Sequence, residues 1–528
     1  MPESSEWWKS GVLYQVYPRS YADTNGDGVG DLRGVLDHLD HLERLGVAGV
    51  WLNPVTVSPD ADWGYDVADY TAVQPVLGSL ADLDALIAAA GERGIRVLLD
   101  LVPNHTSDQH AWFVESRRSR DNPKRDWYVW ADPKPDGSPP NNWISSFGGP
   151  AWTFDDATGQ YYLHNFLAEQ PDLNWWNEEV RDEFDRILRF WFDRGVAGFR
   201  IDVVHMMVKD RLLRDNPAAT EDDHWFVQLQ GQRQLYNANR PEVHDVLRRW
   251  RRIADSYSPG RILVGETHVF DYDTLASFYG TGDELHLAFN FMMLHAPFDA
   301  ATLCDVVTNT LAAIPDGCWP VWTGGNHDTY RFPTRWAGGN ADAARCALVM
   351  LVTLRGTPFL YYGDEIGMPD TDVPRDRLLD PVGLRLYPVY GRDPERTPMP
   401  WNGDPGAGFT EPGVEPWLPF GDVRACNVAD QRDDPESTLQ LTRDLIALRA
   451  ASADLRAGDY ELLTGPPGAW TFRRGSGTVV ALNLTDAPLE TRCARGTVRL
   501  GTRRDREAEQ VDGALTLRPW EAVVVELV

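Results

Sequence analysis

Short apolar runs alternate with amphipathic helical stretches from residue 11 to about residue 365, and this alternation predicts an α/β protein built as a parallel (β/α)8 barrel. Each run is almost continuously apolar, as expected for strands that are covered on both faces. Helical patterns precede several runs, at Leu32–Leu45, Leu80–Arg93 and Glu178–Arg194. The eight expected strands are Val12–Tyr17, Gly49–Leu52, Val97–Leu101, Gly198–Ile201, Ile262–Gly265, Leu287–Phe291, Val321–Gly324 and Pro358–Tyr361.

Two connections of the predicted barrel are too long for ordinary loops. The interval Pro103–Val196, after the third strand, contains clusters of Pro, Gly, Asn and Trp and predicts an inserted subdomain; a smaller insertion is expected at residues 366–423. After the helical stretch Thr438–Ala451, short alternating runs predict a C-terminal antiparallel β domain. The runs are Trp470–Arg473, Val479–Leu484 and Ala522–Val528. The expected domains are a barrel at residues 1–105 and 175–455, a subdomain at 106–174 and a β domain at 456–528.

The composition indicates a folded globular protein that does not bind polyanions. The 528-residue chain has 43% hydrophobic and 24% charged residues and is long enough for a large catalytic domain with smaller pieces. Its formal charge of −29 disfavours nucleic acid and anionic membranes as partners. The 21 tryptophans, several of them in polar, loop-like contexts, favour carbohydrate as a ligand, because indole faces stack on sugar rings.

The five cysteines are odd in number and widely spaced, which is typical of reduced thiols rather than of disulfides or a zinc site. The N-terminus lacks the basic and apolar segments of a signal peptide, and no later stretch has 18 uncharged apolar residues. We therefore expect a cytoplasmic protein without a membrane partner, as a monomer or a weak homo-oligomer.

Polar residues follow the predicted strands at their carboxyl ends, where barrel enzymes place their chemistry. One such residue would be unremarkable, but several that converge on one mouth would perturb one another's pKa values. They are Asp100 and Asn104–His105 after the third strand, Asp202 after the fourth, Glu266 after the fifth, Asn326–Asp328 after the seventh and Asp364–Glu365 after the eighth.

Arg200 and Asp202 lie two positions apart, so a strand would present them on the same face. The guanidinium would then hold the Asp202 carboxylate ionised, as a nucleophile requires, although a structural ion pair explains this spacing equally well. Glu266 follows an apolar run and has no basic neighbour in sequence, which makes it the better candidate for a protonated acid. Together with Asp328, these carboxylates suit chemistry at an acetal carbon.

A second group of oxygen-bearing side chains occurs early in the chain, in the segment DTNGDGVGD. Asp23, Asn25, Asp27 and Asp31, with the Val29 carbonyl, have the spacing of an EF-hand-like loop, although the glutamate that ends such a loop is replaced by glycine. We expect a structural divalent cation here, Ca²⁺ or alternatively Mg²⁺, and a solvated acidic turn is the other interpretation. No organic cofactor is expected.

Four motifs, in this order, resemble those of the α-amylase family of glycoside hydrolases, and within it the oligo-1,6-glucosidase and α-glucosidase subfamily. The resemblance runs from about Trp8 to the C-terminus. It implies a retaining, exo-acting α-glucosidase that works by double displacement on short α-glucosides. The motifs are DLVPNH (Asp100–His105), GFRIDV (Gly198–Val203), VGET (Val264–Thr267) and GGNHD (Gly324–Asp328), with QPDLN at Gln170–Asn174 as the mark of the subfamily.

The resemblance also implies roles for single residues. Asp202 would be the nucleophile, Glu266 the general acid and then base, and Asp328 the carboxylate that binds ring hydroxyls. The family carries a divalent ion in the loop after the first strand, which agrees with the segment Asp23–Asp31. The residues implied in glucose binding are Asp62, Tyr65, His105, Phe166, Arg200, His327 and Arg392, with Arg396 as the alternative to Arg392.

The linkage and the reaction outcome stay open. In this subfamily the residue after the nucleophile is associated with linkage preference, and Val203 favours α-1,6 bonds, while the residues that follow it leave α-1,4 bonds, sucrose and trehalose as alternatives. The same covalent intermediate would serve a glucosyltransferase or a disaccharide isomerase. An inactive sugar-binding relative is disfavoured because all three carboxylates are present. His205 either lines the outer pocket or packs in the core.

Overall fold

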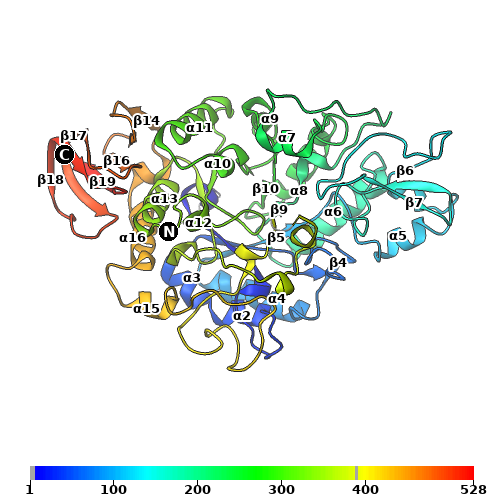
Figure 1. Ribbon diagram of the computed structural model, residues 1–528, viewed down its shortest axis with the longest axis horizontal. Coiled ribbons are helices and arrows are strands. Elements are labelled where there is room, and N and C mark those ends of the chain that lie inside the picture. Colours follow the sequence, from blue (N-terminus) through cyan, green and yellow to red (C-terminus); the bar gives the residue numbers. More distant parts are fainter. Residues whose placement is uncertain (1–5, 387–389) are drawn as a thin grey trace. The chain divides into compact units, whose positions relative to one another are not determined.

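The computed structural model describes residues 6–386 and 390–528 (Figure 1). The chain forms two compact units. Unit one comprises Met1–Leu52, Ala85–Val97 and Phe289–Val528, and unit two comprises Asn53–Asp84 and Leu98–Ala288. Each unit therefore gathers segments that are far apart in the sequence.

Eight parallel strands form one sheet in the order β11, β10, β9, β5, β2, β1, β13, β12. Strands of this sheet that follow one another along the chain are neighbours, except β11 and β12, which stand at the two ends of the order, and the first strand β1 also pairs with the last strand β13. This is the order of a (β/α)8 barrel. The predicted fold is confirmed, because each expected run overlaps one of these strands. They are β1 (Leu13–Val16), β2 (Gly49–Leu52), β5 (Arg96–Leu101), β9 (Gly198–Ile201), β10 (Ile262–Gly265), β11 (Leu287–Ala288), β12 (Val321–Thr323) and β13 (Thr357–Tyr361).

The sixth strand of the barrel is shorter than predicted. β11 ends at Ala288, whereas the sequence suggested a strand to Phe291. Asn290 stops it, because its side chain accepts a hydrogen bond from the Met293 N–H and thereby begins helix α10 (Phe291–His295).

The strand register in unit two aligns the residues that carry charge. Arg200 on β9 is level with Asp100 on β5 and with Val264 on β10. Two further backbone bonds, each 2.8 Å long, continue the ladder beyond the strand ends, from the Asp202 N–H to the Leu101 carbonyl and from the Glu266 N–H to the Ile201 carbonyl. The side chains at the ends of β5, β9 and β10 are therefore brought to one level of the sheet.

The predicted helical stretches form helices, and α8, α11 and α13 lie outside the stretches that were predicted. The stretch Leu32–Leu45 is two helices, because His38 has a non-helical backbone (φ −107°, ψ 12°) between them. Asn177 begins α6 by accepting a hydrogen bond from the Glu179 N–H. The longer helices are α2 (Leu32–Asp37), α3 (Leu39–Leu45), α4 (Leu80–Glu92), α6 (Glu178–Asp193), α8 (Val243–Asp255), α11 (Ala300–Ala313), α13 (Ala341–Thr353) and α16 (Thr438–Ala451).

The interval between β5 and α6 contains a small antiparallel sheet of its own, in the order β6 (Trp130–Ala131), β8 (Gln160–Leu163), β7 (Trp152–Asp155). Trp143, Ala151, Trp152 and Leu163 form its buried core. An inserted subdomain was predicted here, and the exact boundaries given for it remain a prediction.

A second antiparallel sheet occupies the C-terminal part of unit one. Three of its six strands overlap the predicted alternating runs, and the other three were not predicted. The strand order is β14 (Tyr460–Leu463), β15 (Ala469–Arg474), β16 (Thr478–Asn483), β19 (Ala522–Leu527), β17 (Leu489–Gly501), β18 (Gln510–Leu517). Its core is aliphatic and includes Val479, Val498, Leu515 and Val525.

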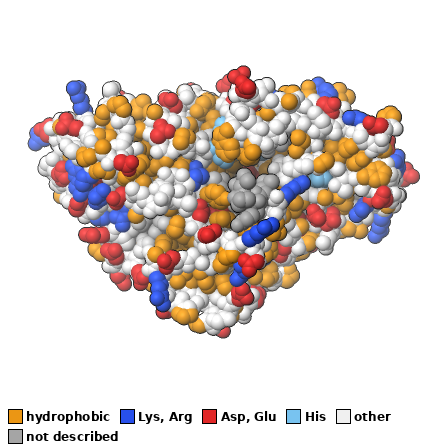
Figure 2. All heavy atoms as spheres, viewed as in Figure 1, with side chains coloured by type: hydrophobic (Ala, Val, Ile, Leu, Met, Phe, Trp, Pro, Cys, Tyr) orange, Lys and Arg blue, Asp and Glu red, His pale blue; other side chains and the backbone are white. Residues whose placement is uncertain are grey.

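The surface carries scattered charges of both signs on the face shown in Figure 2. Within the described part of the chain, no helix has the length and apolar character needed to cross a bilayer. All five cysteines are free thiols.

Candidate active site

One guanidinium is shared by three carboxylates at the carboxyl ends of β5, β9 and β10. Arg200 Nη1 lies 2.9 Å from Asp100 Oδ1 and 2.7 Å from Asp202 Oδ1. Arg200 Nη2 lies 2.6 Å from Glu266 Oε2. The arginine side chain is 1% exposed, so water competes little for these contacts. The predicted pair of Arg200 and Asp202 is present, and the structure adds Asp100 and Glu266 to it.

These carboxylates carry more negative charge than one guanidinium neutralises. Burial raises the pKa of Asp202 well above its usual range; Arg200 offsets this only in part, and Glu266 and Asp100 add to the rise. Burial is also the main reason why the pKa of Asp100 rises to about 6. The group therefore retains a proton at pH values where isolated carboxyls would be ionised. This differs from the expectation that Arg200 simply keeps Asp202 ionised, because that arginine is shared.

Glu266 and Asp202 each use one oxygen for support and leave the other available. Glu266 Oε2 accepts hydrogen bonds from Arg200 Nη2 and from the Val203 N–H, the latter at 3.0 Å. Asp202 Oδ1 accepts from Arg200 Nη1. Among the described residues, Glu266 Oε1 and Asp202 Oδ2 have no hydrogen-bond partner. Two buried carboxyls with one free oxygen each suit an acid and a nucleophile.

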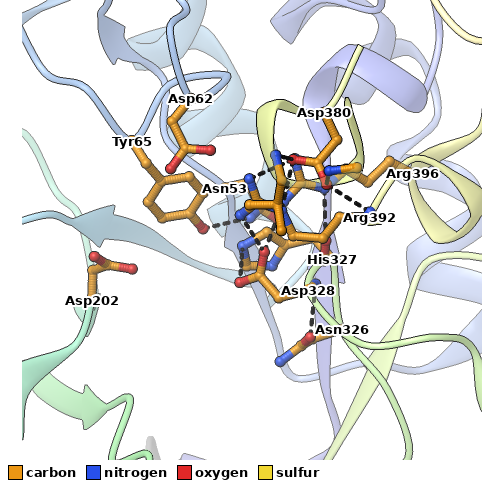
Figure 3. A network of polar contacts seen from close by, with 12 residues as sticks. Asn53, Asp62, Tyr65, Asp202, Asn326, His327, Asp328, Asp380, Arg392 and Arg396 are labelled. Atoms are coloured by element: carbon orange, nitrogen blue, oxygen red, sulfur yellow. Dashed lines mark hydrogen bonds and ion pairs between the residues drawn. The ribbon is translucent and has the colours of Figure 1, made fainter. Parts of the chain in front are cut away.

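Tyr65 extends this group through its hydroxyl. The hydroxyl donates to Asp100 Oδ2 at 2.9 Å. It accepts from Asn53 Nδ2 at 2.8 Å, a contact that is drawn in Figure 3. The Arg200 guanidinium lies 5.9 Å from the centre of the Tyr65 ring. Tyr65 is therefore fixed by polar contacts at its hydroxyl end, and it was predicted as a binding residue.

His105, Asp62 and Phe166 lie around the same part of unit two. His105 Nδ1 accepts from Asn104 Nδ2 at 3.0 Å, so its Nε2–H is free to donate to the Tyr65 carbonyl, also at 3.0 Å. Burial lowers the pKa of His105 to about 4, and the ring is neutral at pH 7. The Phe166 ring is 5.1 Å from it. The structure thus brings five predicted residues together, namely Asp62, Tyr65, His105, Phe166 and Arg200.

Gln170, the first residue of the QPDLN segment, holds this group together. Its side-chain nitrogen donates to Asp62 Oδ2 at 3.2 Å and to the Tyr65 carbonyl at 3.3 Å. The side chain is fully buried. The sequence marked this segment as a family feature but did not show what it contacts.

A second charged cluster lies in unit one, around Asp328 (Figure 3). Asp328 Oδ2 is 3.0 Å from His327 Nε2. Asp328 Oδ1 is 3.1 Å from Arg392 Nη1 and 2.7 Å from Arg396 Nη2. Both candidate arginines therefore contact the carboxylate, and neither replaces the other. Burial opposes ionisation, but His327, Arg392 and Arg396 outweigh it and lower the pKa of Asp328 well below its usual range.

Gln15 determines which nitrogen of His327 carries the proton. The Gln15 amide nitrogen donates to His327 Nδ1 at 2.8 Å, so the proton of the neutral ring is on Nε2 and points to Asp328. The side chain of Asp328 remains 32% exposed, whereas His327 is fully buried. Asp328 is thus an ionised acceptor that is held rigidly and still open to a ligand.

A family model described as the catalytic domain of alpha amylase matches residues 15–458, a range that includes both clusters. The chain belongs to the α-amylase family. It is 42% identical over 488 residues to a probable alpha-glucosidase of Rhizobium meliloti (strain 1021), with 89% of this chain and 88% of the relative covered. It is 39% identical over 528 residues to an oligo-1,6-glucosidase of Heyndrickxia coagulans, with 91% and 93% covered. The crystal structure of the alpha-glucosyl transfer enzyme XgtA is 41% identical, has a TM-score of 0.92 and covers 99% of both chains.

This α-amylase family member has a buried aspartate behind Arg392 that the sequence did not indicate. Asp380 Oδ1 accepts from Arg392 Nε at 3.0 Å and from Nη2 at 2.7 Å, and Oδ2 accepts from the Arg392 N–H at 2.8 Å. Although burial opposes it, Arg392 and Arg396 lower the pKa of Asp380 to about 2. Asp380 is in no family motif used above, so no pattern pointed to it.

Lys209 forms a second unpredicted contact, in unit two. Its Nζ lies 2.7 Å from Asp172 Oδ2 and 2.6 Å from Asn104 Oδ1, and the side chain is 3% exposed. Asp172 belongs to the QPDLN segment. This buried ion pair ties that segment to the chain that follows the β9 end.

His205 supports the segment that carries Glu266. Its Nδ1 lies 3.3 Å from the Glu266 carbonyl, and its own carbonyl accepts from the Asn239 N–H at 2.7 Å. The residue is 3% exposed, and burial lowers its pKa to about 4. These contacts favour the packing role over the outer-pocket role.

The predicted cation loop of this family member is closed by its own hydrogen bonds. Asp23 accepts from the N–H groups of Asn25, Gly26 and Gly28 and from the Thr410 hydroxyl. Asp31 accepts from Thr24 and from the Gly34 N–H, which caps α2. Within residues 6–386 and 390–528, no three acidic, histidine or cysteine side chains form a group suited to a metal ion. The ligand set of Asp23, Asn25, Asp27, Val29 and Asp31 stays a prediction.

Proposed function

We propose that this protein is a retaining, exo-acting α-glucosidase that releases glucose from the non-reducing end of short α-glucosides and also transfers it. The observation that carries the proposal is the buried Arg200 group, in which Asp202 and Glu266 each keep one oxygen free. Relatives that are named alpha-glucosidase and oligo-1,6-glucosidase support this substrate class.

We assign to Glu266 the proton that this carboxyl group retains, so that Asp202 is ionised at the start. In the first step, Asp202 Oδ2 attacks the anomeric carbon, and Glu266 Oε1 gives its proton to the departing oxygen. Arg200 supports both carboxyls throughout. When the ester forms, Asp202 loses its negative charge as Glu266 becomes ionised. The charge beside Arg200 is therefore conserved, and Glu266 is ready to act as a base.

In the second step, ionised Glu266 takes a proton from water, whose oxygen attacks the anomeric carbon and releases Asp202. We assign to Asp328 the binding of ring hydroxyls, because it is ionised, rigidly held and partly exposed. His327 and the two arginines orient it. Asp62, Tyr65, His105 and Phe166 are proposed to surround the terminal glucose.

Transfer to an alcohol in place of water is the second candidate outcome. The 41% identical XgtA is named an alpha-glucosyl transfer enzyme, which favours this outcome over an inactive sugar-binding role. All three proposed catalytic carboxylates are also present. The valine at position 203 supports α-1,6 specificity by the resemblance noted above.

A substrate panel tests the proposal. Maltose, isomaltose, sucrose and trehalose are incubated with the enzyme, and free glucose and new glucosides are quantified. We expect release of glucose, with initial retention of the α-configuration by NMR, and fastest turnover of isomaltose. Turnover of none of the four would contradict the α-glucosidase assignment, and mainly new glucosides with little glucose would make the protein a transferase.

We further propose a cytoplasmic location and a structural divalent cation in the loop Asp23–Asp31. The five free thiols support a reducing compartment. The spacing of the oxygen-bearing side chains supports the cation, and thermal unfolding with and without chelator tests it.

A further inference from the structure

A buried network of side-chain hydrogen bonds in unit two extends in two branches from the ion pair between Lys209 and Asp172. One branch leads to His105, and the other passes through three asparagines. Each residue of the network is at most 3% exposed, so water competes little for its contacts. The residues are Lys209, Asp172, Asn104, His105, Asn165, Asn237 and Asn216.

The ion pair gives the network its direction. A lysine can only donate hydrogen bonds, and an aspartate paired with it can only accept them. Asn165 therefore turns its amide nitrogen to Asp172 Oδ2, at 2.7 Å. Its oxygen is then left to accept from Asn237 Nδ2, at 3.0 Å. The two charges at the centre thus determine how the amides along this branch are oriented.

The other branch fixes the tautomer of His105. Lys209 Nζ donates to Asn104 Oδ1 at 2.6 Å, so the amide nitrogen of Asn104 faces His105 Nδ1, at 3.0 Å. Because an amide nitrogen cannot accept a hydrogen bond, Nδ1 carries no proton and the ring proton is on Nε2. His105 Nε2 lies 3.0 Å from the Tyr65 carbonyl, which accepts that proton. Both ring nitrogens are therefore satisfied when the ring is neutral.

A second proton on His105 would conflict with this arrangement. It would place two donors, Nδ1–H and the Asn104 amide, only 3.0 Å apart. Asn104 could turn its oxygen to the ring only by setting its amide nitrogen against Lys209 Nζ. Burial is the largest cause of the lowered pKa of His105, and the charge of Lys209 contributes, whereas Asp172 and the Tyr65 carbonyl oppose it.

We propose that Lys209 is a positioning residue that acts through Asn104 to hold His105 as a neutral Nε2–H donor in the glucose pocket. This inference rests on the proposed glucosidase function and deepens it. The sugar gains positive charge as the bond to the leaving group breaks. An imidazolium in the wall of the same pocket would oppose that charge, whereas a neutral ring does not.

Asn104→Asp tests the role of the amide without removing the lysine. The aspartate keeps one oxygen for Lys209 and turns a second acceptor to His105 Nδ1, which favours the doubly protonated ring. Protein labelled with nitrogen-15 histidine is titrated by NMR, and the His105 signal is the one that is lost in His105→Gln. We expect the Nε2–H tautomer in the wild type. The titration midpoint should be about one to three pH units higher in Asn104→Asp.

Two variants of Lys209 and one control complete the series. Lys209→Met leaves Asn104 free to turn and should also raise the midpoint, whereas Lys209→Arg keeps a charged donor and should restore most of the wild-type value. Asn237→Ala is the matched control, because it removes an amide from the other branch. It should lower the unfolding temperature without moving the midpoint of His105.

The pH dependence of turnover tests the consequence for the reaction. With a midpoint of about pH 6, about nine tenths of the His105 rings are charged at pH 5. The ratio of kcat/KM at pH 5 to that at pH 8, on p-nitrophenyl α-glucoside, should therefore be about tenfold lower in Asn104→Asp than in the wild type. A midpoint that moves while this ratio stays the same would overturn the proposal.

The NMR results can overturn it independently of turnover. A wild-type ring with its proton on Nδ1, an unchanged midpoint in Asn104→Asp, or an equal shift in Asn237→Ala would each do so. The wild-type tautomer is measured whether or not a variant folds. A wild type that cleaves no α-glucoside but shows these shifts contradicts the proposed function and leaves the control of His105 by Lys209 standing.

Discussion

The backbone N–H of Val203 donates a hydrogen bond to Glu266 Oε2 at 3.0 Å from a left-handed conformation with φ 34°. A β-branched residue rarely adopts this conformation, and holding it costs about 1 kcal/mol or more. The contact ties the residue after the proposed nucleophile to the proposed acid. Val203 is also packed against Met206 and Ala238, with Phe166 beside them.

Substitution of Val203 should reverse the usual order of alanine and glycine. Val203→Ala loses packing and keeps the strained backbone, whereas Val203→Gly loses similar packing but relieves the strain by about 1 kcal/mol. We expect the glycine variant to unfold at the same temperature as the alanine variant or a higher one, measured by circular dichroism. A markedly lower midpoint for glycine would show that φ at this position is not strained.

Asp202→Asn should abolish turnover while the protein stays folded. Asparagine keeps an oxygen that accepts from Arg200 but cannot form the glucosyl ester. We expect kcat on p-nitrophenyl α-glucoside to fall by about four orders of magnitude or more, with an unchanged circular dichroism spectrum. Activity within about tenfold of the wild type would remove Asp202 from its assigned role.

Glu266→Gln should discriminate between good and poor leaving groups. Glutamine keeps the oxygen that accepts from Arg200 and from Val203 but has no acidic proton. The p-nitrophenolate ion leaves without being protonated, whereas the leaving glucose of maltose needs a proton. The variant should therefore lose less kcat/KM on p-nitrophenyl α-glucoside than on maltose. Equal losses on both substrates would argue against Glu266 as the acid.

Asp100→Asn should stabilise the protein at high pH. The pKa of Asp100 is raised to about 6, chiefly by burial, above the value of about 4 for an unfolded aspartate. When the pKa of a carboxyl is higher in the folded state, ionisation of that carboxyl destabilises the fold. The native state is therefore least affected below about pH 4 and loses stability as the pH rises through about 6. The variant should therefore unfold at a higher temperature than the wild type at pH 8, and the gap should close towards pH 4. Asp156→Asn, at an exposed position, is the control and should show no such trend.

The loop Asp23–Asp31 gives a prediction about metal. If it binds a divalent cation, Ca²⁺ should raise the unfolding temperature and a chelator should lower it. Asp27→Ala should abolish both shifts, because it removes one of the predicted ligands. The variant should stay folded, because Asp27 is exposed and bonds only within the loop. Identical unfolding curves with Ca²⁺ and with chelator would leave the loop an ordinary acidic turn.

The barrel strands were predictable because each is a short apolar run, and such runs have few other structures open to them. The strands of the C-terminal sheet were harder to predict. The long strand Leu489–Gly501 contains charged residues and a glycine, and its register shifts between Cys493 and Gly496. Such irregular strands lack clean alternation, so three of the six strands had no usable signal. The break at His38 was missed for a related reason, since the apolar spacing continues through it.

By itself, the sequence located the barrel strands and the polar residues that follow them, because apolar runs and the polar residues after them are local properties of the chain. Arg200 and Asp202 were linked in this way, being two positions apart. Only the tertiary structure decided that the same guanidinium also holds Asp100, 100 positions away, and Glu266, 66 positions away. Parallel pairing of β5, β9 and β10 creates that sharing. Burial of the group raises the pKa of Asp202, and the neighbouring carboxylates Glu266 and Asp100 add to the rise. Contacts between distant segments depend on strand register, and register is not written in any one segment.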